Sequence, residues 1–344
     1  MRRVGVCLLS LLLHLAPPAK AQVPLLELPG VAGLDAAGQR EAARYLAMNL
    51  PRAFAMGPNG AYGWQSGGRE PERVEAIALA SCQRRSGGAP CHIAARDLTL
   101  RIPGREWSAP AAPTTQPVGG FAWEALPDPR FLWWGPASGR GVLLFAHGRA
   151  ARGADSRGGQ PQNWTRHFNN NGYDIWRFDR HPASDETQQA AGWMRRALTM
   201  LRGQGYRHIV VAGQSRGGWN TLMMLDQPGL ADVHIAIAPA AHGYTGSPSH
   251  LRQLDELRGI LGAAAGAGRA RLAIASFRDD PFDADTERRA ALFRELGARA
   301  GAFLFIDRPE RPVGHGGGNS AEFSYVFGPC LLRFATEPNA PSAC

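Results

Sequence analysis

From residue 121 to the C-terminus, short hydrophobic runs alternate with stretches in which hydrophobic positions recur every three or four residues. Short, continuous, β-branched runs are typical of strands buried on both faces of a sheet. These runs cover residues 141–146, 173–178, 208–212, 234–238, 271–276 and 302–306. The helical periodicity between them predicts helices near residues 164–171, 184–203, 219–226, 250–262, 285–300 and 321–334. We expect Ser184 or Asp185 to cap the helix over 184–203. The alternation predicts an α/β fold with a mostly parallel, doubly wound sheet and right-handed crossovers.

The N-terminal part has a different pattern. Hydrophobic spacing predicts helices over 36–50 and 70–84 and a strand over 91–100, with a turn signal at Asn59-Gly60. We therefore expect a small α+β module over residues 22–105. Residues 106–120 are rich in Pro, Ala and Thr and predict a linker to a domain over 121–344.

Residues 1–21 are expected to be a signal peptide rather than part of the fold. Arg2 and Arg3 precede a short apolar stretch, and Ala19-Lys20-Ala21 provides the small residues of a cleavage site. The apolar stretch is too short to span a bilayer, so we expect no stable membrane anchor. The pattern predicts a bacterial protein exported to the periplasm or the extracellular space.

Four cysteines follow the leader: Cys82, Cys91, Cys330 and Cys344. Three pairings are possible, and we expect Cys82–Cys91 and Cys330–Cys344 because each closes a short local loop. Their spacing is not that of a zinc site, so no metal is expected.

The net charge of +9 does not predict a nucleic-acid surface. Lys20 is the only lysine, and the arginines are scattered rather than gathered with aromatic residues. We therefore expect no nucleic-acid partner.

The sharpest motif is Gly213-Gln214-Ser215-Arg216-Gly217, which directly follows the strand over 208–212 and precedes a helix. A strained turn at this place would lift the serine hydroxyl above the sheet edge. Glycines two before and two after it would leave room where side chains would collide. The motif predicts that Ser215 is a nucleophile.

A serine hydroxyl needs a base, and a carboxylate must orient that base. His315 lies in a glycine-rich loop after the last strand, and His242 ends the strand over 234–238. Past the strand over 271–276 three carboxylates compete, namely Asp279, Asp280 and Asp283. Asp283 could instead cap the next helix.

In chain order, His147-Gly148-Arg149, the GQSRG turn, the Asp280-Pro281 turn and Gly314-His315-Gly316 each follow a strand. This order resembles the α/β-hydrolase superfamily, and within it the dienelactone-hydrolase-like and carboxylesterase-like members. The resemblance implies Ser215, Asp280 and His315 as the catalytic triad, with Asp283 as the alternative acid. It also implies that the backbone N–H groups of Arg216 and Arg149 form the oxyanion hole.

The resulting hypothesis is a serine hydrolase that cleaves small-molecule carboxylic esters through an acyl-enzyme, without a cofactor. Serine replaces the cysteine nucleophile of dienelactone hydrolases, and the loop after the strand over 141–146 reads His147-Gly148-Arg149 instead of an extended HGGG oxyanion motif. A peptidase or amidase on the same fold is the alternative enzyme. A non-catalytic envelope binding protein is the alternative outside enzymes.

Arginines also gather near the predicted strand ends, and we hypothesise that Arg149 or Arg216 binds an anionic group of the substrate. The competing explanation is that arginine supplies nearly all basic residues of this chain. His242 is interpreted as a pocket wall or substrate contact.

Overall fold

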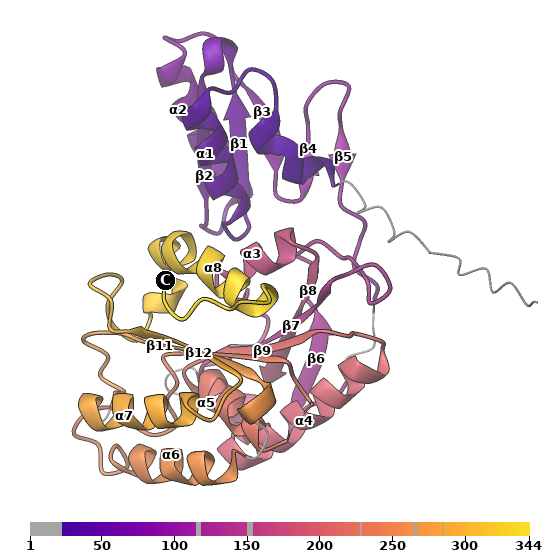
Figure 1. Cartoon of the computed structure of the whole chain (residues 1–344). Coiled ribbons are helices and arrows are strands. Elements are labelled where there is room, and N and C mark those ends of the chain that lie inside the picture. The colour runs from indigo at the N-terminus through magenta and orange to yellow at the C-terminus, as the bar shows by residue number, and fades with distance from the viewer. Residues whose placement is uncertain (1–22, 115–117, 150–153, 228, 265–266, 284) are drawn as a thin grey trace, which may run out of the picture.

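The computed structural model describes residues 23–114, 118–149, 154–227, 229–264, 267–283 and 285–344. The predicted signal peptide over residues 1–21 lies outside these residues. Figure 1 shows a smaller N-terminal unit beside a larger α/β unit. No helix in the described part of the chain is long and apolar enough to cross a membrane.

The larger unit is built on a seven-stranded sheet of order β12-β11-β10-β9-β7-β8-β6, in which only the β6–β8 pair is antiparallel. Its strands are β6 (Trp123–Pro127), β7 (Gly141–Ala146), β8 (Tyr173–Arg180), β9 (Ile209–Gln214), β10 (Val233–Ile237), β11 (Arg271–Ser276) and β12 (Ala302–Asp307). The predicted mostly parallel sheet is confirmed. The edge strand β6 was not predicted, because alternate burial at an edge gives no continuous hydrophobic run.

Helices cover both faces of this sheet, as predicted for a doubly wound fold (Figure 1). One face carries α3 (Thr165–Asn170) and α8 (Ala321–Thr336), whose phenylalanines pack on the central strands. The other carries α4 (Thr187–Gly203), α5 (Arg216–Met223), α6 (Arg252–Ala263) and α7 (Thr286–Gly297). Short 3-10 turns are η4 (Pro182–Ser184), η5 (Met224–Asp226), η6 (Ala267–Arg269) and η7 (Gly317–Asn319).

Two predicted helix starts are wrong. The α4 helix begins at Thr187, because Ser184 ends the separate turn η4, and the side chain of Glu186 caps it by accepting the Gln189 N–H at 2.7 Å. The α5 helix begins at Arg216, directly after the serine motif, instead of at residue 219. This early start brings the helix N-terminus onto Ser215.

The N-terminal unit is an antiparallel sheet of order β2-β1-β3-β4-β5 with two helices. Its elements are η1 (Pro24–Gly30), α1 (Ala36–Leu46), β1 (Arg52–Met56), η2 (Pro58–Gly60), β2 (Tyr62–Ser66), α2 (Pro71–Arg85), β3 (His92–Arg96), β4 (Thr99–Leu100) and β5 (Trp107–Ser108). The predicted α+β character agrees with this sheet and its helices.

Three details of the module prediction are wrong. The first helix ends at Leu46 instead of residue 50. The single strand expected over 91–100 is two strands, because Asp97 turns the chain with φ 52°. Strand β5 lies inside the expected linker and pairs with β4, so the module's sheet extends past residue 105.

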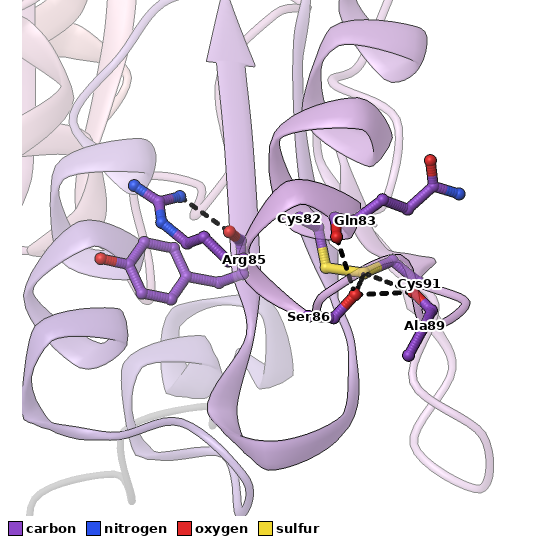
Figure 2. Close-up of a disulfide and its surroundings, with 7 residues drawn as sticks. Cys82, Gln83, Arg85, Ser86, Ala89 and Cys91 are labelled. Carbon is purple, nitrogen blue, oxygen red and sulfur yellow. Dashed lines mark hydrogen bonds between the residues drawn. A yellow bond between two sulfur atoms is a disulfide. The ribbon is translucent and has the colours of Figure 1, made fainter.

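Both predicted disulfides form. Cys82–Cys91 joins α2 to the chain just before β3, and Cys330–Cys344 joins α8 to the C-terminus. In Figure 2 the Ser86 hydroxyl lies in the loop closed by the first disulfide, 2.7 Å from the carbonyl oxygen of Ala89.

Candidate active site

Ser215 occupies a strained turn between β9 and α5. Its backbone has φ 54° and ψ −119°, a region that residues with a side chain rarely adopt. The Ser215 N–H donates to the carbonyl of Ile237 at 2.9 Å, and the Ser215 carbonyl accepts the Trp219 N–H at 2.9 Å. Such strain persists only where the surrounding structure holds it. The turn places Ser215 at the carboxyl edge of the sheet.

The glycines of the motif allow the close backbone approach that this turn requires. A Cβ on Gly213 would lie 2.3 Å from the carbonyl carbon of Gly217, and a Cβ on Gly217 would lie 2.1 Å from the carbonyl oxygen of Ala146. Both neighbours are backbone atoms, so neither can move aside without moving the sheet. Glycine is therefore required two residues before and two residues after Ser215 for the steric reason that the motif predicts.

His315 and Asp280 meet at the same edge of the sheet. The Nδ1 atom of His315 lies 2.9 Å from Oδ2 of Asp280, whose side chain is 4% exposed, while the histidine side chain is 19% exposed. The other carboxylate oxygen of Asp280 accepts the Phe282 N–H at 2.8 Å, and the Phe282 ring packs on the imidazole with centroids 4.3 Å apart. The carboxylate is therefore fixed by both of its oxygens, and it holds the Nδ1 side of the imidazole.

The two rival carboxylates lie elsewhere. Asp283 is paired with Arg289 at 3.3 Å, and both side chains are buried. Burial raises the pKa of Asp283, and the Arg289 charge acts in the opposite direction. Asp279 is exposed and has φ 59°. Of the three candidates, Asp280 alone contacts His315.

The loop of His315 is also tied to the serine turn. The Gln214 side-chain amide donates to the carbonyl oxygen of His315 at 3.3 Å. Among the described residues, the Ser215 hydroxyl and Nε2 of His315 have no hydrogen-bond partner within 3.5 Å. Catalytic hydrogen bonds are often long before substrate binds. The fold therefore brings the two loops together through Gln214, and no described residue binds either the serine hydroxyl or this Nε2.

The two segments predicted to donate to an oxyanion both lie beside the serine. Arg216 is the first residue of α5, so its N–H has no acceptor within the helix. The loop after β7 runs against the serine, since a Cβ on Gly148 would lie 3.2 Å from the Ser215 Cβ. Arg149 follows in this loop and is exposed. Both predicted donors therefore lie in segments that adjoin Ser215.

His147 holds this loop in place. Its Nε2 accepts the Arg180 N–H at 2.9 Å, so its Nδ1 carries the proton and donates to the Gly148 carbonyl at 2.7 Å. Burial, reinforced by the Arg180 charge, lowers the pKa of His147 to about 3. The ring is neutral near pH 7, and its two hydrogen bonds join β8 to the loop after β7.

The two arginines hypothesised to bind an anion differ in burial. The Arg216 side chain is buried, and its guanidinium donates to the Thr187 hydroxyl and, at 2.8 Å, to the Ala241 carbonyl. Its burial lowers its pKa. The Arg149 side chain is exposed. The anion-binding hypothesis therefore stays a prediction for the exposed Arg149, whereas the Arg216 side chain is occupied by Thr187 and Ala241.

His242 follows the segment that packs on the serine turn. Its Nε2 lies 2.7 Å from Oε1 of Glu256 on α6, and its side chain is partly exposed. This pairing was not predicted, because Glu256 comes from a helix distant in sequence. The interpretation of His242 as a substrate contact stays a prediction.

Two site residues escaped the sequence analysis. Gln214 joins the serine turn to the His315 loop, and Phe282 packs on the imidazole. Gln214 lies inside the serine motif, so the sequence showed its position. The sequence did not show that its side chain binds the His315 carbonyl. Within the described residues, no group of three or more His, Cys, Asp or Glu is arranged to hold a metal ion.

The strand order with one antiparallel edge strand, together with the strained strand–turn–helix at Ser215, makes this an α/β-hydrolase fold. No family model and no curated protein matches the chain.

Among the solved structures similar to the chain are a lipase, an esterase and DcsB. A monoacylglycerol lipase from Paleococcus ferrophilus is 15% identical, with a TM-score of 0.42, over 57% of this chain and 94% of the lipase. Esterase 2 from Thermogutta terrifontis is 18% identical, with a TM-score of 0.41, over 68% of this chain and 96% of the esterase. DcsB, in complex with a substrate analogue, is 13% identical, with a TM-score of 0.43, over 58% of this chain and 91% of DcsB. Because these TM-scores are low, the fold assignment depends on the chain's own strand order and serine turn.

Proposed function

We propose that this protein is a serine hydrolase that cleaves small-molecule carboxylic esters. The observation that carries the proposal is the strained turn at Ser215, at the sheet edge where Asp280 orients His315. A positive φ at a serine costs stability, on the order of 1–3 kcal/mol, and is typical of sites where the strain serves function.

In the first step, the Ser215 oxygen attacks the ester carbonyl, and Nε2 of His315 takes the hydroxyl proton. Asp280 holds the Nδ1–H and stabilises the charged ring. The N–H groups of Arg216 and Arg149 would stabilise the oxyanion. The tetrahedral intermediate collapses to an acyl-enzyme, and the leaving alcohol takes the proton from His315.

In the second step, His315 removes a proton from water, which attacks the acyl-enzyme. The second intermediate expels the carboxylic acid, and the proton returns to Ser215. The proton given to the alcohol comes from Ser215 and the one returned to Ser215 comes from water, so the cycle needs no cofactor.

A labelling experiment tests the assignment. We expect a fluorophosphonate probe to label the wild type and not the Ser215→Ala variant, and a panel of short and long acyl esters to be hydrolysed only by the wild type. Ser184→Ala is the matched control, since Ser184 follows β8 near the same edge and its hydroxyl contacts the carbonyl of Ala122 at 3.3 Å. Equal labelling of wild type and Ser215→Ala would contradict the proposal. Preference for amides with the same acyl groups would move it to the amidase alternative.

We also propose that the chain is exported. Its two disulfides are of the kind that forms in oxidising compartments. Fractionation of cells expressing the full chain tests this, with Arg2→Glu/Arg3→Glu expected to retain it in the cytoplasm.

A further inference from the structure

The N-terminal module touches the hydrolase unit through the turn over residues 46–50, which joins α1 to β1. The guanidinium of Arg52 is buried and donates to the carbonyls of Tyr45, Leu46 and Met48, at 3.0, 2.7 and 2.9 Å. These carbonyls lie at and just past the end of α1, where backbone acceptors have no partner further along the helix. Arg52 therefore sets the shape in which the turn presents Asn49 to the hydrolase unit.

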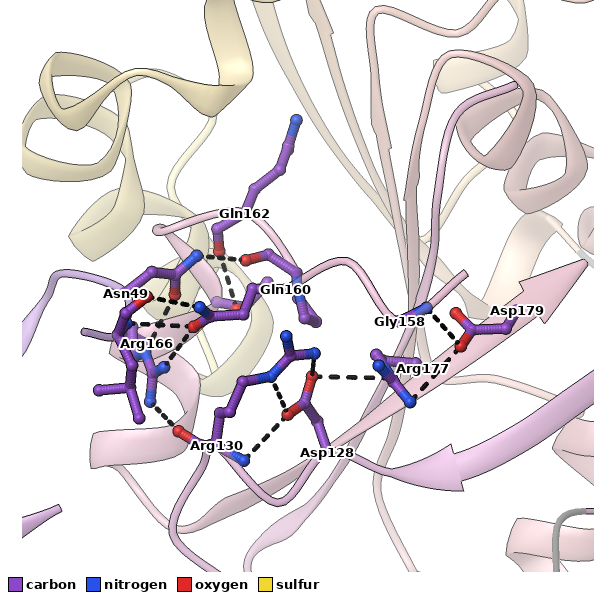
Figure 3. A network of polar contacts seen from close by, with 12 residues as sticks. Asn49, Asp128, Arg130, Gly158, Gln160, Gln162, Arg166, Arg177 and Asp179 are labelled. Carbon is purple, nitrogen blue, oxygen red and sulfur yellow. Dashed lines mark hydrogen bonds and ion pairs between the residues drawn. The ribbon is translucent and has the colours of Figure 1, made fainter. Parts of the chain in front are cut away.

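The turn holds residues 160–163, near the end of the long loop that begins at Gly148. The Asn49 N–H donates to Oδ1 of Asn163 at 2.8 Å, and its side-chain amide donates to the Pro161 carbonyl at 2.7 Å. The Leu50 N–H and carbonyl both bind the Gln160 side-chain amide, at 3.1 and 2.6 Å. Figure 3 shows this contact with Asn49 and Gln160 labelled. Four hydrogen bonds thus fix a four-residue segment.

A buried charge makes this contact costly to open. Arg166 on α3 is fully buried and donates to Oδ1 of Asn49 at 3.1 Å, to the Arg130 carbonyl at 2.7 Å and to the Gln160 side chain at 3.1 Å (Figure 3). These three acceptors are neutral. Separating the module would remove one of them from a buried guanidinium. The module is therefore a fixed part of the molecule and not a loosely tethered domain.

From the held segment, one side chain reaches the loop of the proposed base. Gln162 is 5% exposed, its amide donates to Oδ1 of Asn319 at 2.9 Å, and its carbonyl oxygen accepts the indole N–H of Trp164 at 2.7 Å. Asn319 ends the turn η7, which begins two residues after His315.

The turn η7 packs closely against its neighbours at Gly318. A Cβ on Gly318 would lie 2.4 Å from the Ile237 side chain and 3.1 Å from the Gln162 amide. Ile237 is also the residue whose carbonyl accepts the Ser215 N–H. The segment held by the module and the end of β10 therefore form the seat on which the His315 loop lies.

We propose that Asn49, Gln162 and Asn319 are positioning residues, through which the N-terminal module sets the place of the His315 loop over Ser215. This inference rests on the proposed function. None of the three is placed in contact with the reacting atoms. Their effect would be on how often the imidazole is within reach of the serine.

Steady-state kinetics on the full chain tests the path. We expect Asn319→Ala to lower kcat about tenfold with KM changed less than about twofold, since small displacements of a catalytic group reduce rate more than binding. Asn319→Asp keeps the acceptor for Gln162 and should restore most of kcat. Asn49→Ala should lower kcat in the same direction, and the double variant should be little slower than Asn319→Ala alone.

Asn170→Ala is the matched control, because its side-chain amide donates to the Leu46 carbonyl of the same turn at 3.0 Å but lies off this path. We expect it to lower the Tm with kcat unchanged. If Asn49→Ala and Asn319→Ala also lowered only the Tm, the module would be purely stabilising and the proposal would be overturned.

Amide hydrogen exchange gives a readout that does not need hydrolysis. We expect Asn49→Ala to speed exchange in residues 314–320, with β9 and β10 unchanged. If the wild type hydrolysed no ester, the proposed function would fail, and this measurement would still decide whether the module holds the loop. Unchanged exchange over 314–320 would overturn the positioning role.

Discussion

The carboxylate of Asp280 binds His315 through one oxygen at 2.9 Å and a backbone N–H through the other at 2.8 Å. It can thus hold the imidazole in one orientation while remaining unpaired with any arginine among the described residues. Asp283, three residues later, is instead paired with the buried Arg289. Two carboxylates on one loop therefore have different partners, a histidine for Asp280 and an arginine for Asp283.

Asp280→Asn should lower kcat by about 10³–10⁴ with the fold retained, because the amide favours the wrong tautomer of the histidine. Asp279→Asn is the control at an exposed neighbouring site, where asparagine also tolerates the positive φ. Asp283→Asn should lower the Tm, since it leaves Arg289 buried without a charged partner. Ester kinetics and thermal unfolding separate the three. A larger kcat loss in Asp283→Asn than in Asp280→Asn would reverse the assignment of the acid.

Ser215→Gly should be inactive yet more stable than Ser215→Ala, by about 1 kcal/mol, because glycine adopts φ 54° without strain. Thermal or urea unfolding of the two variants measures this difference. Equal stability would mean that the turn at Ser215 stores no strain.

Gly217→Ala should be severely destabilising, by more than about 3 kcal/mol, because the added Cβ would lie 2.1 Å from the Ala146 carbonyl oxygen. Gly192→Ala is its control within α4, where nothing lies within 4 Å of an added Cβ. That change should stabilise the protein by about 0.5–1 kcal/mol. Urea unfolding of both variants checks the opposite signs.

Arg149→Gln should raise KM for esters that carry a carboxylate more than for neutral esters, because the exposed guanidinium can meet the anion. Its backbone N–H is kept, so kcat for neutral esters should change little. Arg216→Gln should instead affect both classes alike, since its side chain bonds Thr187 and Ala241. Equal losses on both ester classes in Arg149→Gln would remove the anion-binding hypothesis.

Acid should destabilise the protein partly through His234. Burial lowers the pKa of this side chain to about 4, below the ordinary value of about 6.5. Between these two pKa values His234 is protonated in the unfolded chain and neutral in the folded chain. The free energy of unfolding therefore falls as the pH drops from about 6.5 towards 4. For this residue the loss between pH 7 and pH 5 is about 2 kcal/mol. His234→Gln should show a shallower fall of Tm over this interval, and an identical fall would contradict the prediction.

The sequence by itself determined the parallel sheet, the serine turn and both disulfides. Buried parallel strands need continuous hydrophobic runs, the turn needs glycines at fixed spacing, and short cysteine loops close locally. Each of these signals lies within a few residues of chain.

Tertiary structure decided the rest, because it depends on partners far apart in sequence. The sequence had left Asp283 as an alternative acid, and only the fold pairs Asp283 with Arg289. Likewise only the fold buries Arg216 against Thr187 and Ala241. The edge strand β6 pairs with β8 across some fifty residues of chain. The contact between Asn49 and residues 160–163 spans more than a hundred residues, so only the folded chain brings the module to the site.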